Sequence, residues 1–191
     1  MPDADTPRNR GPAVAPANRA ALIAAGRRQF AAHGYGVPLS AIARDAGVGQ
    51  GVLYRHFGTR LALALAIFTE NIEALEATAA THREPETIAL LVRTLVEQTL
   101  ASAAFVEAVV RASAESDWAG GRRVVALLEA PLARALAAGH VRPDLTVDDV
   151  VLLVSMVHGI GLTHRDPTAA RAAAARAVLL VDPFLGAAIE G

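Results

Sequence analysis

The sequence contains no cysteine and no lysine. Without cysteine the chain forms no disulfide, no thiolate metal site, no cysteine nucleophile and no iron–sulfur cluster. Its most apolar run, residues 150–162, is interrupted by Ser155 and His158 and is too short to span a bilayer. The first residues lack the apolar core of a signal peptide. We therefore expect a cytoplasmic protein without a membrane partner.

Aromatic residues are also scarce, at 4% of the sequence, whereas hydrophobic residues make up 53%. Most of this apolar content is Ala, Leu and Val. Alanine favours helix because it loses no side-chain entropy there, and no segment shows the period-two alternation of a strand. The sequence predicts an all-α fold with three parts: a disordered arm at 1–17, a small domain at 18–62 and a larger helical domain at 63–191.

Breaker and capping residues divide this pattern into about nine helices. Asn18 is the expected N-cap of the first helix and Gly34 its C-cap. Thr146 and Asp149 form an expected capping box, and Pro183 is expected to break or kink the last helix. The expected helices lie at about 18–33, 38–46, 50–56, 60–80, 85–99, 105–118, 122–138, 146–161 and 166 onward.

Charge is distributed unevenly along the chain. Residues 1–60 carry eight arginines against three aspartates, whereas residues 61–191 carry ten arginines against sixteen acidic residues. A basic end joined to an acidic body favours contact between the basic end and a polyanion.

The segment 39–57 has the pattern of a helix-turn-helix. Two short helical stretches flank Gly47-Val48-Gly49, and their apolar residues are spaced to be buried. The second stretch is polar on its other side, and an amide there can bond a base edge while hydroxyl and guanidinium groups bond phosphates. The outward residues are Gln50, Gly51, Tyr54, Arg55 and His56.

Residues 22–68, about a quarter of the chain, resemble the DNA-binding domain of the tetracycline-repressor (TetR) family. The matching features are Phe30, Gly34, Ile42-Ala43, Ala46-Gly47-Val48 and the block Leu53-Tyr54-Arg55-His56-Phe57. The resemblance implies that Gln50, Gly51, Val52, Tyr54 and His56 occupy recognition-helix positions.

The resemblance also implies that Arg60 grips a phosphate at the start of the fourth helix. Two positions depart from the family pattern. Val37 replaces a threonine that caps the second helix, so that Pro38 and Ser40 must substitute for it, and Leu61 replaces an acidic residue. The predicted DNA-binding residues are Ser40, Gln50, Gly51, Val52, Tyr54, Arg55, His56 and Arg60.

The larger domain is expected to dimerise and to bind a ligand. The helix at 147–162 is apolar on nearly every side, and the Ala-rich segment at 169–185 permits close approach, so that together they predict a two-fold homodimer interface. Few charges lie in the central helices, which favours a small apolar effector. The candidate pocket residues are Phe68, Leu91, Leu95, Phe105, Val109, Trp118 and Met156.

No cofactor or metal is expected. His158 and His164 fall on different helical faces and do not make a metal pair, and no nucleophile elbow or phosphate-binding glycine loop is present. The sequence therefore predicts a ligand-responsive homodimeric repressor of a palindromic double-stranded DNA operator, and not an enzyme. The alternative is a helical ligand-binding or enzymatic bundle whose helix-turn-helix-like motif docks another protein.

Overall fold

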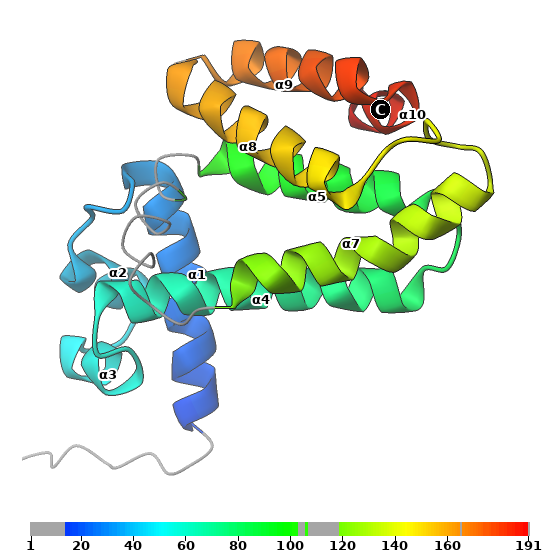
Figure 1. The fold of residues 1–191 in the computed structure, drawn as a ribbon. Helices are drawn as coiled ribbons and strands as arrows, with labels where there is room; N and C mark the ends of the chain where they lie inside the picture. The colour runs from blue at the N-terminus through cyan, green and yellow to red at the C-terminus, as the bar shows by residue number, and fades with distance from the viewer. Residues whose placement is uncertain (1–13, 103–105, 107–118, 165, 191) are drawn as a thin grey trace, which may run out of the picture. The chain divides into compact units, whose positions relative to one another are not determined.

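The computed structural model describes residues 14–102, 106, 119–164 and 166–190, and all regular structure within them is helical (Figure 1). The predicted all-α fold is confirmed, whereas the expected helix at 105–118 lies outside the described residues apart from Val106. The helices are α1 (Val14–His33), α2 (Leu39–Asp45), α3 (Gln50–His56), α4 (Arg60–Thr81), α5 (Thr87–Ala101), α7 (Gly120–Ala137), α8 (Val147–Thr163), α9 (Pro167–Val181) and α10 (Pro183–Glu190).

The chain divides into two compact units, at residues 1–64 and 65–191. The division falls two residues beyond the predicted boundary, and Leu63 and Ala64, the last residues of the first unit, are buried. None of the described helices is both long and apolar enough to cross a membrane.

In the N-terminal unit, α1 packs against α2 and α3. Apolar residues of α1, including Leu22, Ile23 and Phe30, are buried. The start of α1 differs from the prediction, because the helix begins at Val14 and Asn18 lies inside it. Pro16 fits the first turn, where its missing N–H needs no partner and its fixed φ suits a helix.

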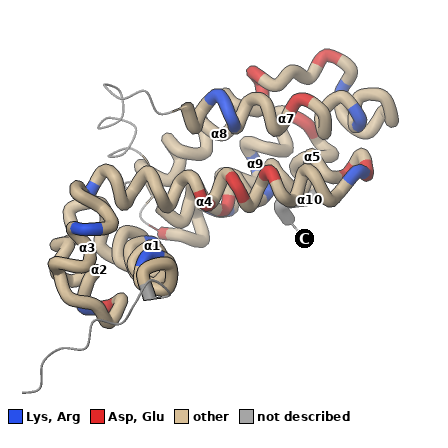
Figure 2. The backbone as a smooth tube through the Cα atoms, turned by 90° about the horizontal axis from the view of Figure 1, so that it is seen from below, with Lys and Arg blue, Asp and Glu red and all other residues tan. Residues whose placement is uncertain are grey.

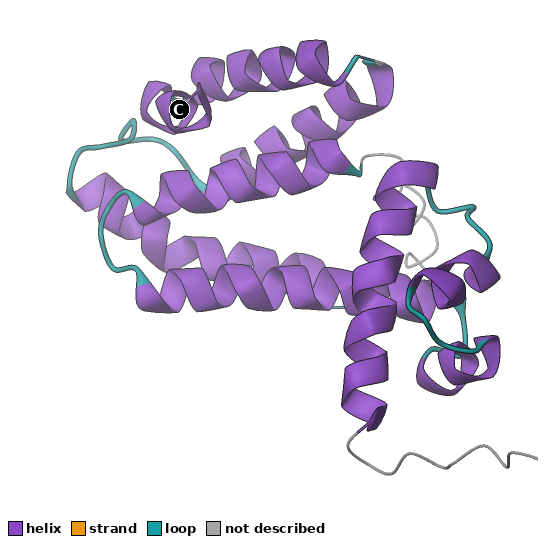
Figure 3. Cartoon of the chain, turned by 180° about the vertical axis from the view of Figure 1, so that it is seen from behind, coloured by secondary structure: helices purple, strands orange, loops and turns teal. Residues whose placement is uncertain are grey.

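In the C-terminal unit, α5 lies at the centre and contacts α7, α8, α9 and α10 (Figure 3). One side of α5 supplies buried apolar residues, and Val150, Leu153 and Val157 of α8 face the same core. The buried apolar residues of α5 are Ile88, Ala89, Leu91, Val92, Leu95 and Val96.

Local capping groups fix the ends of α8 and α9 as the sequence predicts. Thr146 accepts a hydrogen bond from the Asp149 amide while the Asp149 carboxylate accepts one from the Thr146 amide, which is the predicted capping box. The Thr146 hydroxyl and then the Thr146 amide, both of which donate to the Asp149 carboxylate, hold the pKa of Asp149 below its ordinary value. Asp166 caps α9, which has Pro167 in its first turn. The predicted break at Pro183 is present, and α10 begins there.

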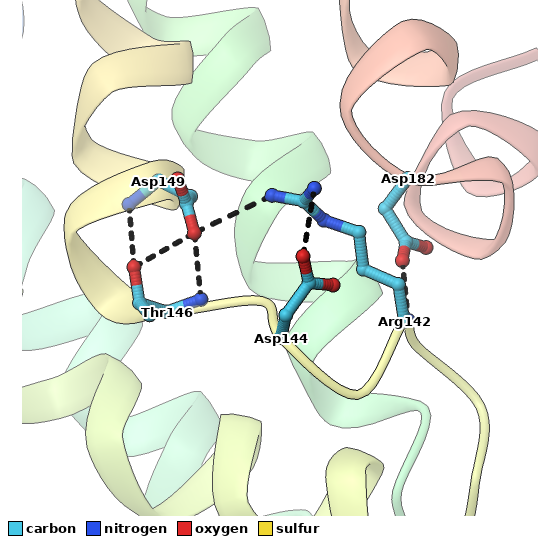
Figure 4. Close-up of polar contacts among 5 residues, drawn as sticks. All are labelled: Arg142, Asp144, Thr146, Asp149 and Asp182. Carbon is cyan, nitrogen blue, oxygen red and sulfur yellow. Dashed lines mark hydrogen bonds and ion pairs between the residues drawn. The ribbon is translucent and has the colours of Figure 1, made fainter.

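A buried carboxylate connects the loop between α7 and α8 to α10 (Figure 4). Asp182 is 1% exposed. Its Oδ2 accepts a hydrogen bond from the Arg142 amide at 2.8 Å, and its Oδ1 accepts bonds from the Phe184 and Leu185 amides at 2.9 and 3.2 Å. The Arg142 guanidinium lies in the same loop, 3.4 Å from Asp149 Oδ2. The first turn of α10 is therefore attached to the segment that leads into α8.

Candidate nucleic-acid interface

The helix-turn-helix predicted from residues 39–57 is present as α2, a short turn and α3. Gly47 ends α2 with φ of 69°, a left-handed conformation that favours glycine. The Val48 amide donates to the Ala43 carbonyl at 3.0 Å, which closes the turn. Ile42 and Ala43 of α2 are buried, as is Leu53 of α3. The turn thus sets the direction in which α3 leaves α2.

α3 has a buried side and an exposed side, and of the five residues predicted to face outward all but the half-buried His56 are exposed. Leu53 and, just after the helix, Phe57 are buried, whereas Val52 and His56 are half-buried. Gln50, Gly51 and Arg55 are exposed, and Tyr54 is 49% exposed. A Cβ atom added at Gly51 would meet no atom within 4 Å outside its own stretch of helix. This exposed side offers an amide, a phenol and a guanidinium beside a bare backbone, which are groups that bond base edges and phosphates.

The electrostatics of the described N-terminal unit favour an anionic partner. Residues 14–60 contain six arginines and one acidic residue, Asp45, and Figure 2 shows blue segments on α1 and α3. The Asp45 carboxylate is already paired within the protein. Arg28 Nη2 lies 3.2 Å from its Oδ2, and Gln29 donates to the same oxygen at 3.4 Å. The unit therefore carries a net positive charge.

The predicted phosphate contact Arg60 has partners within the protein. Its Nη1 donates hydrogen bonds to the main-chain carbonyls of Tyr35 and Val37, in the turn between α1 and α2. The guanidinium carbon also lies 5.6 Å from the centre of the Tyr35 ring. Burial raises the pKa of the Tyr35 phenol, and the positive charge of Arg60 opposes that rise. Sequence reasoning missed Tyr35 altogether.

The start of α2 lacks a side-chain cap. Pro38 is the N-cap residue and makes no side-chain capping bond. Pro38 therefore takes the place of a capping threonine without replacing its hydrogen bond. Val37 is buried, whereas Ser40 is exposed in the first turn of α2. Ser40 is therefore accessible to an external group such as a phosphate.

A second contact that the sequence did not indicate joins α1 to the end of α3. The Arg19 guanidinium carbon lies 5.5 Å from the centre of the Phe57 ring, which is a cation–π contact. Arg19 is exposed and lies on α1, near the end of α3 through this contact. Nothing in the spacing of the two residues along the chain predicts such a contact.

The candidate pocket residues of the C-terminal unit differ in burial. Leu91 and Leu95 lie in the buried core of α5, and Phe68 of α4 is half-buried. Met156 is exposed, because it lies one turn after the exposed Leu152 on the outer side of α8. Phe105, Val109 and Trp118 lie outside the described residues.

An exposed set of large apolar side chains lies on α8 and α9, which contact each other. Leu180 is 71% exposed and Leu152 is 59% exposed. We call this set the apolar face, and it comprises Leu152, Met156, Leu162 and Leu180. Exposed large apolar side chains on two helices in contact make these helices a candidate protein–protein interface.

Comparison with known proteins identifies the N-terminal unit. Residues 22–67 match the family described as bacterial regulatory proteins, tetR family. No curated protein was found to match the chain.

Solved structures extend the similarity over most of the chain. A TetR transcriptional regulator from Streptomyces coelicolor is 30% identical, with a TM-score of 0.65 over 85% of this chain and 95% of that chain. A TetR transcription regulatory protein from Mycobacterium vanbaalenii is 32% identical, with a TM-score of 0.63 over 75% of this chain and 90% of that chain. A gamma-butyrolactone receptor, described as ArpA-like, shares the fold at 22% identity, with a TM-score of 0.59 over 93% and 98% of the two chains. The chain belongs to the TetR family of bacterial transcriptional regulators.

Proposed function

We propose that this protein is a ligand-responsive homodimeric repressor that binds a palindromic operator through α3 of each protomer. The observation that carries the proposal is the exposed side of α3, on which Gln50, Gly51, Tyr54 and Arg55 lie together in a unit of net positive charge. Regulators of this family bind DNA, act as dimers and are not enzymes.

The residues of α3 are assigned different roles in recognition. Gln50 starts the helix, where its amide can reach a base edge, and Gly51 lets the backbone approach the groove. Tyr54 lies one turn further and offers its hydroxyl to a phosphate. Arg55 and the half-buried His56 extend the phosphate contacts, Val52 packs against the groove wall, and Ser40 of α2 adds a hydroxyl.

The apolar face is assigned to the homodimer. Leu152, Met156 and Leu162 on α8 and Leu180 on α9 would meet their symmetry mates across a two-fold axis. Two recognition helices related by that axis require two half-sites of a palindrome, about 34–36 Å apart. Met156 belongs to this face in the proposal, rather than to a ligand pocket.

The effector is assigned to the C-terminal unit and to the apolar class. Arg93 and Glu97 are the charged residues of α5, and neither lies on its buried side. Leu91, Leu95 and Phe68 would therefore present an apolar wall, completed by Phe105, Val109 and Trp118. A structural neighbour is named as a gamma-butyrolactone receptor, which supports binding of a small organic molecule in this fold.

The switch is assigned to α4, because this helix begins in the N-terminal unit at Arg60 and continues into the C-terminal unit. Within the C-terminal unit, Glu76 of α4 is ion-paired to Arg123 of α7. A ligand that binds one arrangement of α4 more tightly than another shifts the population of DNA-binding dimers.

The test is a selection of genomic DNA fragments by the purified full chain at moderate salt, followed by fluorescence anisotropy on the enriched duplex. We expect a palindrome whose affinity falls steeply as salt rises, because arginine–phosphate contacts release counterions. Candidate effectors should then release the duplex. If no palindrome is enriched, the proposed function is wrong.

A further inference from the structure

Arg60 is the first residue of α4, and its guanidinium is directed to the turn between α1 and α2. Both hydrogen bonds come from Nη1, one to the Tyr35 carbonyl and one to the Val37 carbonyl. The guanidinium also lies over the Tyr35 ring, 5.6 Å from its centre, and the Arg60 side chain is half-buried. Hydrogen bonds from a charged donor are about twice as strong as neutral ones. One side chain thus holds two main-chain carbonyls of this turn.

The turn that Arg60 holds determines where α2 begins. Gly34 leaves α1 with φ of 72°, and the Val37 amide donates to the Gly34 carbonyl at 3.3 Å. The Tyr35 ring also stacks with that of Phe30, with the ring centres 5.8 Å apart and the planes 26° apart. Pro38 follows as an N-cap without a side-chain capping bond. The start of α2 therefore depends on contacts to the turn itself, of which Arg60 makes the charged ones.

We infer that Arg60 is a positioning residue for DNA recognition, which fixes the α1–α2 turn and through it the placement of α2 and α3. The inference rests on the proposed function, because it assigns a role within the same DNA-binding surface. The role differs from the phosphate contact that the family resemblance implies. In the described conformation, Nη1 donates to two protein carbonyls and the guanidinium carbon lies over the Tyr35 ring.

The two roles of Arg60 have different consequences for DNA binding. A phosphate contact is independent of DNA sequence, so its loss weakens binding to operator and scrambled duplexes alike. Its loss also reduces the slope of log affinity against log salt by about 0.9. A positioning residue acts through the fit of α2 and α3 to the operator. Its loss therefore weakens binding to the operator and leaves binding to scrambled DNA almost unchanged.

The first experiment measures the affinity of the unsubstituted full chain and of Arg60→Met for operator and scrambled duplexes. Fluorescence anisotropy is used, over a range of salt concentrations. We expect Arg60→Met to lose roughly tenfold or more on the operator, with scrambled binding and its salt slope retained. Arg55→Met, on the exposed side of α3, serves as the comparison for a direct contact. Parallel losses on both duplexes with a reduced salt slope would overturn the inference.

Two further variants guard against a simple folding defect. Arg60→Lys keeps the charge but has no planar group to lie over Tyr35, so we expect it to remain impaired on the operator; full recovery would favour the phosphate contact. Tyr35→Leu leaves the Arg60 charge in place and removes the ring that it covers. We expect Tyr35→Leu to reduce the preference for the operator in the same way, and an unchanged preference would count against the inference.

A spectroscopic test reports on the contact without DNA. The sequence has two tyrosines, so that in a Tyr54→Phe background Tyr35 alone gives the phenolate absorbance at alkaline pH. Because Arg60 opposes the rise in the Tyr35 pKa, adding Arg60→Met should raise that pKa further. An unchanged titration would overturn the inference even if an operator is found. If the titration shifts but no palindrome is ever selected, the proposed function fails separately.

Discussion

Arg123 of α7 and Glu76 of α4 form a two-point ion pair, with Nε 2.9 Å from Oε1 and Nη2 2.8 Å from Oε2. The parallel geometry is the one in which a guanidinium and a carboxylate bind most specifically. The bond from Arg123 holds the pKa of Glu76 below its ordinary value, and Glu76 in turn raises the pKa of Arg123. The pair joins two helices that are separated by a large part of the chain.

The Glu76 pair predicts a pH-dependent contribution to stability. Since the pKa of Glu76 is lowered on folding, its contribution is present above the unfolded pKa of about 4.3 and is lost as pH falls through the lower folded value. Glu76→Gln should therefore cause a small drop in Tm at neutral pH, which disappears in strong acid. Thermal unfolding followed by circular dichroism at both pH values measures this difference.

Glu73→Gln is the matched control for that experiment. Glu73 is exposed on the same helix, and it acts on Arg123 through charge alone, as the smallest of the contributions to its pKa. An equal drop in Tm for the two variants would mean that the two-point geometry contributes nothing beyond general charge.

Gly51 predicts a separation of stability from DNA binding. A methyl group added there meets no protein atom within 4 Å, and alanine favours helix over glycine by up to about 1 kcal/mol. Gly51→Ala should leave Tm unchanged or slightly raised, yet weaken operator binding by roughly tenfold, or about 1.4 kcal/mol, because the methyl group meets the DNA.

Gly121→Ala supplies the control for Gly51→Ala. Gly121 lies in α7, where an added methyl group also meets nothing within 4 Å. This variant should match Gly51→Ala in stability and bind the operator normally by anisotropy. Wild-type affinity for Gly51→Ala would remove Gly51 from the DNA-facing surface.

Gln50 and Tyr54 should differ in how they affect sequence preference. Gln50→Ala is expected to cost roughly 1–3 kcal/mol of binding free energy and to relax preference at one base position in each half-site. Tyr54→Phe removes a phosphate contact and should weaken all sequences about equally. A panel of operators with single-base substitutions, measured at fixed salt, distinguishes these outcomes. An unaltered preference profile for Gln50→Ala would exclude it from base reading.

A substitution at Leu180 tests the proposed dimer interface. Because its side chain is 71% exposed in the single chain, Leu180→Glu should leave the protomer folded but weaken the dimer. The expected loss is about 3 kcal/mol or more for the two symmetry-related copies. Light scattering over a concentration series should show monomers, and circular dichroism should show retained helix.

Ala126→Glu, at an exposed position of α7, is the control for Leu180→Glu and should stay dimeric. Val154 is a poorer probe although it lies on α8, because it packs against the core of its own unit. If Leu180→Glu is as dimeric as Ala126→Glu, the apolar face is not the interface.

Gly186 predicts a packing defect between α9 and α10. A methyl group at Gly186 would lie 2.6 Å from Leu179 Cα and 2.9 Å from its Cβ. Since one of these atoms is backbone, the two helices would have to separate, and Gly186→Ala should cost about 1–3 kcal/mol of the free energy of unfolding. Denaturant unfolding beside Gly121→Ala measures the cost, and equal stability of the two variants would contradict it.

Features determined by neighbouring residues could be predicted from the sequence. The capping box of Thr146 and Asp149, the left-handed glycines after α1, α2 and α7, and the break at Pro183 all depend on residues within a turn of each other. The exposed side of α3 was also predictable, because helical spacing alone separates Leu53 from Tyr54 and Arg55. The sequence predicts the start of α1 too late in the chain. Asparagine is a common N-cap residue, but the residues before Asn18 are helical as well.

Features that depend on distant residues could not be predicted. Arg60 lies 25 residues from Tyr35, and Arg123 lies 47 residues from Glu76. No local pattern says which backbone carbonyl or carboxylate a long guanidinium side chain reaches after folding. The exposure of Met156 was missed for a related reason, since α8 is apolar on most sides and its sequence does not show which side the core covers.

Asp182 couples the opening of α10 to the opening of the loop between α7 and α8. Its carboxylate binds the amide of Arg142, which lies 40 residues earlier in the chain, and also binds amides at the start of α10. Detaching α10 would leave a buried carboxylate and the Arg142 amide without partners, at a cost of about 1–3 kcal/mol for each unsatisfied group. Fraying of α10 is thereby coupled to the entrance of α8, the helix that carries most of the apolar face.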